Sequence, residues 1–214
     1  MTTESTLQPL TIALTKGRIL DETLPLLAQC GLEPLDDPRS SRRLIFEANR
    51  PDVRFVVLRG SDVVTYVRQG AADAGIVGKD MLLEHGAQGL YEPLDLGIAR
   101  CSLQTAGFSA SQNLGSRLRV ATKFVNIARA HYAAKGIQAD VIPLYGAMEL
   151  APLMNLADEI VDIVDTGNTL RANGLVPLEH IADVSTRFVV NKAAMRTRHT
   201  LLTDIISALK DAID

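Results

Sequence analysis

Two aspartates, Asp162 and Asp165, stand beside a run of hydroxyl-bearing and turn-forming residues that could bind a phosphate. The run is Thr166-Gly167-Asn168-Thr169, and it follows Asp165 directly. Backbone N–H groups and threonine hydroxyls can converge there on one anion, and the dipole of a following helix favours it. Carboxylates beside such a cradle suit ribose hydroxyls or Mg²⁺. The chemistry indicated is therefore the binding of a phosphate, with ribose hydroxyls or Mg²⁺ beside it.

A buried strand must position these residues. The segment 160–164 is β-branched except for Asp162, which predicts a strand of a parallel sheet. Leu170 and the residues after it favour a helix. The structural alternative is that a Thr or Asp of the loop only caps this helix. An Asp within an apolar strand is costly unless it has a partner or a function, which favours a functional role for Asp162.

A second candidate anion site follows the first predicted strand, 10–14. The tripeptide Lys16-Gly17-Arg18 separates that strand from a helical pattern over 19–27. Gly17 can let the backbone approach an anion, and the two cations supply charge. The alternative is a solvated turn in which the glycine eases the entry into the helix.

Arg59 lies at a similar place in the chain. It comes after a predicted strand, 53–58, and just before a predicted helix, 63–69, for which Ser61 or Asp62 is a natural N-cap. The alternative role for Arg59 is a surface ion pair.

The glycine-rich segment 70–80 predicts a short buried strand. It is not a Walker loop, because its glycines have the wrong spacing and Lys79 is followed by Asp. We expect Asp73 to hold a turn and Asp80 to cap a helix over 81–85. Both roles are structural.

Strands alternate with helices along the chain, which predicts an α/β fold built as two lobes with mainly parallel sheets around a cleft. An extended segment, 94–103, is expected to cross into the second lobe. A strand over 184–191 should return to the first lobe, and a helix over 197–213 should follow it. We therefore expect domain I to comprise 1–97 and 186–214, and domain II, which carries the phosphate loop, to comprise 98–185. The other expected elements are strands at 44–48, 118–122 and 141–145, a loop at 109–117, a helix at 127–135 and a helical turn at 148–154.

The composition of the 214 residues restricts the function classes. The formal net charge is −3, whereas a nucleic-acid binder usually shows a basic face. Aromatic residues make up only 4% and Trp is absent, so the core must be aliphatic. The histidines have no metal-ligand spacing, so no protein-held metal is expected.

The cysteines and the first residues also predict the compartment. Cys30 and Cys101 are far apart in sequence, which suggests buried thiols in a reducing compartment. The first residues lack the basic and apolar regions of a signal peptide, and no apolar run could span a bilayer. We expect a cytoplasmic protein without membrane contact.

The longer pattern around the phosphate loop resembles one family. In the commonest class of phosphoribosyltransferases the two acids before the loop are adjacent, whereas here two residues separate them. The pattern resembles instead the ATP phosphoribosyltransferases, the first enzymes of histidine biosynthesis. The residues that carry this resemblance are Glu149, Ala157-Asp158, Val161-Asp162 and Thr166-Gly167-Asn168-Thr169-Leu170. The tripeptide 16–18 and the segment 70–80 also match, so the resemblance extends from Leu10 to about Met195. It implies the two-lobed fold of the type II periplasmic binding proteins.

The resemblance implies a reaction and a set of site residues. Such an enzyme joins N1 of ATP to C1 of phosphoribosyl pyrophosphate and releases pyrophosphate, with Mg²⁺ bound to the substrate. Asp165, Thr166, Gly167, Asn168 and Thr169 would hold the 5′-phosphate. Glu149 and Asp162 would hold the ribose hydroxyls, and Lys16, Gly17, Arg18 and Arg59 would hold the pyrophosphate and the phosphates of ATP. The residues expected to act in catalysis are Arg59 and Asp162.

The resemblance also implies partners. The chain resembles the short form of the family, which lacks the C-terminal regulatory domain of the long form. Short-form subunits work with a regulatory subunit similar to histidyl-tRNA synthetase, and we expect a homodimer within a hetero-oligomer. Two alternatives remain at this point, a cytoplasmic solute-binding protein of the same fold and a ligand-sensing subunit without activity. Release of pyrophosphate would exclude the first, and binding of phosphoribosyl pyrophosphate by this chain alone would count against the second.

Overall fold

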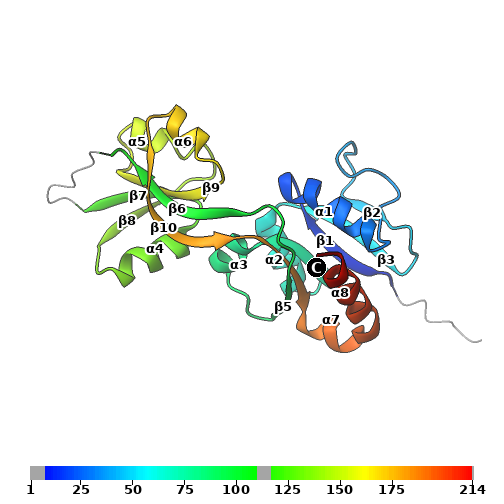
Figure 1. Ribbon diagram of the computed structural model, residues 1–214. Helices are drawn as coiled ribbons and strands as arrows, with labels where there is room; N and C mark the ends of the chain where they lie inside the picture. The colour runs from blue at the N-terminus through cyan, green and yellow to red at the C-terminus, as the bar shows by residue number, and fades with distance from the viewer. Residues whose placement is uncertain (1–7, 110–116, 214) are drawn as a thin grey trace, which may run out of the picture. The chain divides into compact units, whose positions relative to one another are not determined.

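The computed structural model describes residues 8–109 and 117–213, and the chain forms two compact units (Figure 1). Unit 1 combines Met1–Ala99 with Ser185–Asp214, and unit 2 is Arg100–Val184. The inserted unit expected from the sequence was 98–185. Unit 2 is thus one continuous segment, whereas unit 1 is assembled from both ends of the chain.

Unit 1 contains a six-stranded mixed sheet. Strand β1 (Leu10–Thr15) pairs in parallel with both β3 (Val53–Leu58) and β4 (Ala74–Gly78). The other pairings are antiparallel, and they add β2 (Ile45–Glu47) to β3, β11 (Thr186–Asn191) to β4, and β5 (Leu90–Asp95) to β11. The order across the sheet is β2-β3-β1-β4-β11-β5.

Helices cover both faces of this sheet. The side chains of β1 alternate between two apolar clusters: Ile12 and Leu14 pack in one, and Ala13 packs in the other. Helices α1 (Arg18–Gln29) and α8 (His199–Ile213) contribute to the first cluster, and α2 (Gly60–Arg68) and α3 (Lys79–His85) contribute to the second. This double burial explains why β1 is apolar on both faces.

Unit 2 contains a five-stranded mixed sheet in the order β10-β6-β9-β7-β8. Strand β7 (Leu118–Thr122) runs parallel to β8 (Ala139–Pro143) and β9 (Glu159–Val164). Strand β6 (Cys101–Gly107) runs antiparallel to β9 and to β10 (Val176–Val184). The helices of this unit are α4 (Val125–Ala134), α5 (Leu150–Leu153) and α6 (Asn168–Ala172).

The α/β fold with two lobes is confirmed, and the statement that the sheets are mainly parallel is wrong. In each sheet, antiparallel strand pairings are at least as numerous as parallel ones. The missed element is β10, an edge strand with mostly exposed side chains and with Pro177 near its start. Since one side of an edge strand faces solvent, its sequence lacks the apolar run that marks a buried strand.

In two segments the structure has two elements where the sequence predicted one. Segment 94–103 is not one extended crossover, because a turn with left-handed backbone at Gly97 (φ 67°) and Ala99 (φ 49°) separates β5 from β6. The last helix is preceded by a separate short helix, α7 (Lys192–Thr197). The Asn191 side chain caps α7 by accepting hydrogen bonds from the amides of Ala193 and Ala194. The expected loop at 109–117 lies largely outside the described residues.

Two expected helix caps are also wrong. Helix α2 has Arg59 as its N-cap instead of Ser61 or Asp62, and helix α3 has Gly78 instead of Asp80. Neither helix has a side-chain cap hydrogen bond. The N-cap residue of α3 is a glycine, which has no side chain, and that of α2 is an arginine, whose guanidinium can donate but not accept hydrogen bonds.

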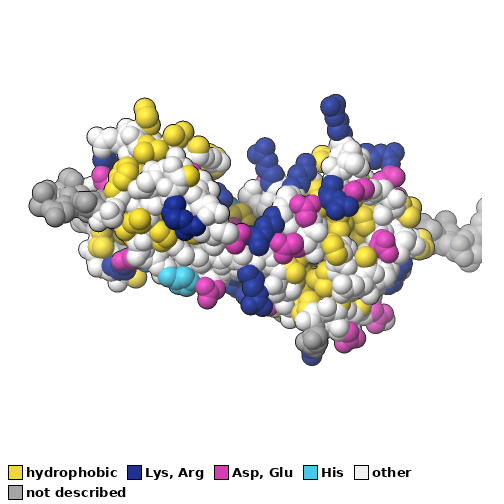
Figure 2. Space-filling view, turned by 45° about the horizontal axis from the view of Figure 1, so that its top comes forward, with side chains coloured by type: hydrophobic (Ala, Val, Ile, Leu, Met, Phe, Trp, Pro, Cys, Tyr) yellow, Lys and Arg dark blue, Asp and Glu magenta, His cyan; other side chains and the backbone are white. Residues whose placement is uncertain are grey.

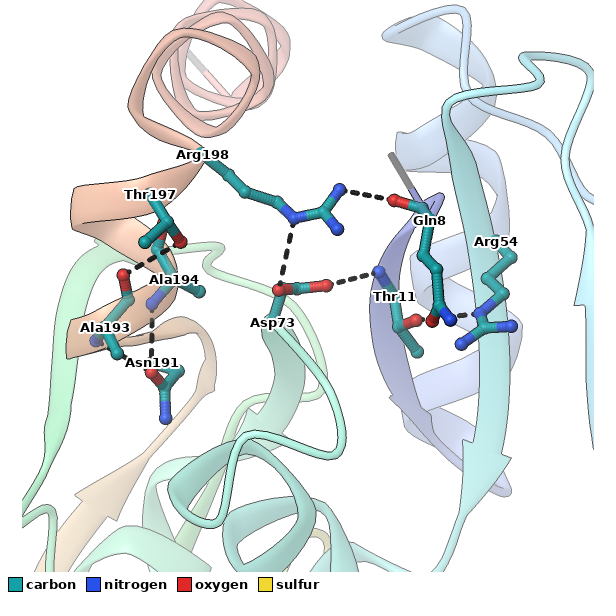
Figure 3. A network of polar contacts seen from close by, with 9 residues as sticks. All are labelled: Gln8, Thr11, Arg54, Asp73, Asn191, Ala193, Ala194, Thr197 and Arg198. Carbon is teal, nitrogen blue, oxygen red and sulfur yellow. Dashed lines mark hydrogen bonds and ion pairs between the residues drawn. The ribbon is translucent and has the colours of Figure 1, made fainter. Parts of the chain in front are cut away.

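Asp73 holds a turn, as expected (Figure 3). Its Oδ2 accepts a hydrogen bond from the amide of Thr11 at 2.8 Å, and its Oδ1 lies 3.7 Å from Arg198 Nε. Arg198 also donates to the carbonyl of Gln8 at 2.6 Å, and Arg54 donates to the hydroxyl of Thr11. This network joins the start of β1 to the junction between α7 and α8, so it fixes the amino ends of the parallel strands.

Both units expose hydrophobic side chains, and Lys and Arg side chains also stand out from unit 1 (Figure 2). Several of the exposed hydrophobic residues belong to unit 2. Among the exposed ones are Tyr145, Leu150, Leu153, Met154 and Leu156, all between β8 and β9. Within the described part of the chain, no helix is both long enough and apolar enough to cross a membrane.

Candidate active-site loops

One pocket of unit 2 lies where β9 ends, and it gathers most of the residues singled out in the sequence. Gln104, the cross-strand neighbour of Asp162, lines this pocket. The residues predicted to bind phosphoribosyl pyrophosphate that also line it are Glu149, Asp162, Asp165, Thr166, Gly167, Asn168 and Thr169. The carboxylates of Glu149 and Asp162 and the loop from Asp165 to Thr169 thus line one pocket, although Glu149 is distant from the loop in sequence.

The backbone of the phosphate loop depends on Gly167. This residue is in the left-handed region, with φ 70° and ψ 8°, and it directly precedes α6. Glycine reaches that conformation without steric cost. Helix α6 has only five residues, so its dipole is small. Exposed hydroxyls and backbone amides must therefore supply most of the attraction for an anion.

Arg171 closes the loop from its helical side. Its NH2 donates to the carbonyl of Thr166 at 3.0 Å and to Oδ1 of Asn168 at 2.5 Å. A Cβ atom placed on Gly167 would lie 3.1 Å from NH1 of the same guanidinium. Arg171 therefore fixes the loop and adds positive charge next to it, although sequence reasoning gave it no role.

Asp162 has a partner, which explains how a carboxylate is tolerated within this strand. Its Oδ1 accepts a hydrogen bond from the amide of Ile163 at 2.8 Å and lies 3.4 Å from Nζ of Lys123. Gln104 of β6 is its cross-strand neighbour. Lys123 was not singled out in the sequence, although it follows β7 just as Lys16 follows β1.

Glu149 reaches the same pocket from the start of α5. It is the N-cap residue of that helix and is half-buried, and its side chain makes no cap hydrogen bond. The carboxylate is thus not used to terminate the helix. It lies in the pocket with Asp162, as the lining residues show.

The loops of unit 1 meet at one edge of its sheet. Thr15 pairs with Leu58 in the parallel β1–β3 ladder, and the amide of Lys16 donates to the carbonyl of Leu58 at 2.9 Å. The tripeptide that starts at Lys16 therefore lies beside Arg59, at the carboxyl ends of two adjacent strands. Lys16 and Arg59 are exposed. Gly17 has φ 83°, and apart from its chain neighbours no atom of the described residues lies within 4 Å of the position that a Cβ would take.

Arg18 forms part of a short network. Its Nε donates to Oε1 of Glu22 at 2.8 Å, and Oε2 of Glu22 accepts from the amide of Ala99 at 2.6 Å. The hydrogen bond from Ala99, with a further contribution from Arg18, lowers the pKa of the Glu22 carboxyl. Glu22 thereby remains ionised and orients the guanidinium of Arg18.

Lys79, at the end of the neighbouring strand β4, has a structural role. Its Nζ contacts both oxygens of Glu92, at 2.7 and 2.8 Å. Arg187 lies 3.5 Å from the same carboxylate and 3.0 Å from Asp95. This charge cluster fastens α3 to the antiparallel strands β5 and β11.

Comparison with known proteins decides the family. The family model for HisG, ATP phosphoribosyltransferase, matches residues 59–211. The chain is 64% identical over 204 residues to the ATP phosphoribosyltransferase of Chromohalobacter salexigens, which covers 95% of this chain and 94% of that protein. The chain belongs to the ATP phosphoribosyltransferase family. It is also 61% identical to the enzyme of Alcanivorax borkumensis, with 96% of each chain covered.

A solved relative of this family has the same fold. It is the ATP phosphoribosyl transferase (HisG:HisZ) complex from Thermotoga maritima, with a TM-score of 0.84 and 32% identity. The match covers 95% of this chain and 98% of that chain. The activity is therefore transfer of the phosphoribosyl group of phosphoribosyl pyrophosphate to N1 of ATP with release of pyrophosphate, the first step of histidine biosynthesis. The solute-binding alternative is wrong.

Proposed function

We propose that the pocket at the end of β9 binds phosphoribosyl pyrophosphate, and that the cationic loops of unit 1 neutralise the pyrophosphate and the phosphates of ATP. The observation that supports this most is the joint lining of one pocket by Glu149, Asp162 and the loop from Asp165 to Thr169. A phosphate held by the loop would leave the ribose beside the two carboxylates.

The chemistry needs positioning and electrostatics more than proton transfer. Negative charge grows on pyrophosphate as the bond to C1 breaks, and exposed cations such as Lys16, Arg18 and Arg59 suit that charge. Positive charge grows on the ribose, and Asp162 and Glu149 can stabilise it. Adenine N1 is already a nucleophile, so no strong protein base is required.

Mg²⁺ is proposed to enter with the substrate. The described residues contain no group of three or more His, Cys, Asp or Glu side chains that could hold a metal ion. Phosphate oxygens of the substrate would supply most of its ligands, and Asp162 or Asp165 of the pocket could add a carboxylate. Bound in this way, the ion would supply positive charge beside the leaving pyrophosphate.

A matched pair of threonine variants tests the loop. Thr166→Val keeps the shape of the side chain and removes its hydroxyl, whereas Thr203→Val makes the same change at an exposed position of α8. Losing one hydrogen bond to an ionised group should weaken the binding of phosphoribosyl pyrophosphate by roughly tenfold or more. Isothermal titration should show this loss for Thr166→Val alone, with ATP affinity unchanged. Equal affinities for the two variants would contradict the assignment.

We also propose that the chain is a short-form catalytic subunit in the cytoplasm, in a homodimer within a hetero-oligomer. The support is the Thermotoga relative, which was solved as a complex of HisG with HisZ. The proposed partner is a separate regulatory subunit similar to histidyl-tRNA synthetase, and it would confer sensitivity to histidine. Pyrophosphate release should respond little to histidine with the chain alone and strongly when the partner is added. Strong inhibition of the isolated chain would overturn the proposal.

A further inference from the structure

Lys123 lies beside the pocket, at the end of the strand next to β9. Thr122 of β7 pairs in parallel with Val161 of β9, so Lys123 and Asp162 each come one residue later on adjacent strands. The distance from Lys123 Nζ to Asp162 Oδ1 is 3.4 Å. A cation therefore stands directly against the carboxylate to which the proposed function assigns the ribose.

The two oxygens of Asp162 have different surroundings. Oδ1 accepts from the amide of Ile163 at 2.8 Å and faces Lys123. Oδ2 receives no hydrogen bond from any residue within 8–109 or 117–213. A carboxylate can accept at both oxygens, so the second remains available for a donor that comes from outside the protein. A ribose hydroxyl is such a donor.

The backbone around Lys123 is firmly held. The hydroxyl of Thr122 donates to the carbonyl of Val161 at 2.6 Å and accepts from the amide of Phe124 at 2.8 Å. Phe124 is fully buried, and the ammonium of Lys123 lies 4.8 Å from the centre of its ring. Anchored residues on both sides thus determine where the base of the lysine side chain stands.

We propose that Lys123 is a positioning residue for Asp162. It holds Oδ1 so that Oδ2 faces the ribose, and its charge offsets the repulsion between Asp162 and Glu149 in one pocket. This inference rests on the proposed assignment of Asp162 to the ribose hydroxyls. Lys123 itself acts through the carboxylate and does not contact the reacting atoms.

A double-mutant cycle tests this role. Lys123→Met keeps the aliphatic stem over Phe124 and removes the charge, and Asp162→Asn keeps the shape of the carboxylate. In the wild-type background, Lys123→Met should lower kcat/KM for phosphoribosyl pyrophosphate about three- to tenfold, because both side chains are partly exposed and the pair is partly screened. In the Asp162→Asn background the same change should lower it less than about twofold, because the partner charge is already gone.

Two further variants complete the experiment. Lys123→Arg should retain most of the activity, since the charge remains. Lys135→Met is the matched control: it also removes the charge of a lysine that is paired in unit 2, with Glu179, at the other end of α4. It should leave kcat/KM unchanged. The affinity for ATP should stay unchanged in every variant.

The possible results separate the inference from the function beneath it. Equal losses from Lys123→Met in the two backgrounds would overturn the positioning role, because Lys123 would then act independently of Asp162. The positioning role would also be overturned if Lys123→Met left kcat/KM unchanged while Asp162→Asn lowered it. A folded Asp162→Asn with normal turnover would instead remove the ribose assignment itself, and the positioning role with it.

Discussion

Replacing Gly167 by alanine should damage the phosphate loop in two ways. The residue has φ 70°, where an L side chain costs about 1–2 kcal/mol. The new Cβ would also lie 3.1 Å from Arg171 NH1. The guanidinium can move, but it then loses contacts to Thr166 and Asn168, each worth about 1 kcal/mol.

Melting curves and calorimetry can separate these two effects. The backbone term alone should lower the melting temperature by about 2–8 °C in a chain of this size. Displacement of Arg171 should weaken the binding of phosphoribosyl pyrophosphate by about fivefold to tenfold, because the loop loses its fixed shape. Gly174→Ala is the matched control: φ is 71° there, and within the part of the chain that the structure describes no atom beyond its chain neighbours lies within 4 Å of the Cβ position. It should lower the melting temperature similarly and leave the affinity unchanged.

A third variant isolates the contact with Arg171. Asparagine tolerates the left-handed region better than alanine, so Gly167→Asn should restore part of the melting temperature. It keeps the Cβ atom, however, so the affinity should remain low. If Gly167→Ala and Gly174→Ala bind phosphoribosyl pyrophosphate equally well, the proposed link between the guanidinium and the shape of the loop is wrong.

Three other outcomes follow from the same structure. Thr169→Ala should weaken the binding of phosphoribosyl pyrophosphate by about tenfold in calorimetry, since one contact to the phosphate is lost; unchanged affinity would argue against the contact. Arg59→Ala should lower kcat more than it raises KM if the cation acts on charge that grows in the transition state, and a change in KM alone would make it a binding residue. Burial, and then the hydrogen bond to Glu159, raise the pKa of Tyr132. Its contribution to stability is therefore present below about pH 10 and is lost as the pH rises further, because the unfolded chain ionises first. Tyr132→Phe should make denaturant midpoints fall less steeply from about pH 9 to pH 11, and parallel curves for the two proteins would contradict this.

Much of the fold could be predicted because apolar periodicity reports burial directly. Strands β1, β3, β7 and β9 are buried on both faces or nearly so, and their sequences show it. The edge strand β10 exposes most of its side chains, so no such pattern marks it. Whether two strands pair in parallel or antiparallel could not be predicted either, because this depends on which strands become neighbours and not on the residues of one strand.

The candidate site could be predicted in part for a similar reason. Asp162, Asp165 and the loop are close together in the sequence, and they line one pocket. Lys123 directly follows another strand, β7, 39 positions before Asp162, and only the pairing of β7 with β9 brings the two together. A basic residue directly after a predicted strand is the signal that could have identified it. Arg171 carried no such signal, because its role depends on the turn made by Gly167.

Strand β4 acquires its neighbour β11 only after the whole of unit 2 has been synthesised. About 110 residues separate Gly78 from Thr186, which the ribosome adds in roughly 5–20 s. Through that interval one edge of β4, all of whose residues are buried in the finished fold, has no partner, and β5 has none either. An unpaired apolar edge is a template for pairing with other chains. The nascent protein therefore carries an edge that can pair with other chains until β11 closes the sheet, and a fragment that stops at Val184 would keep that edge open permanently.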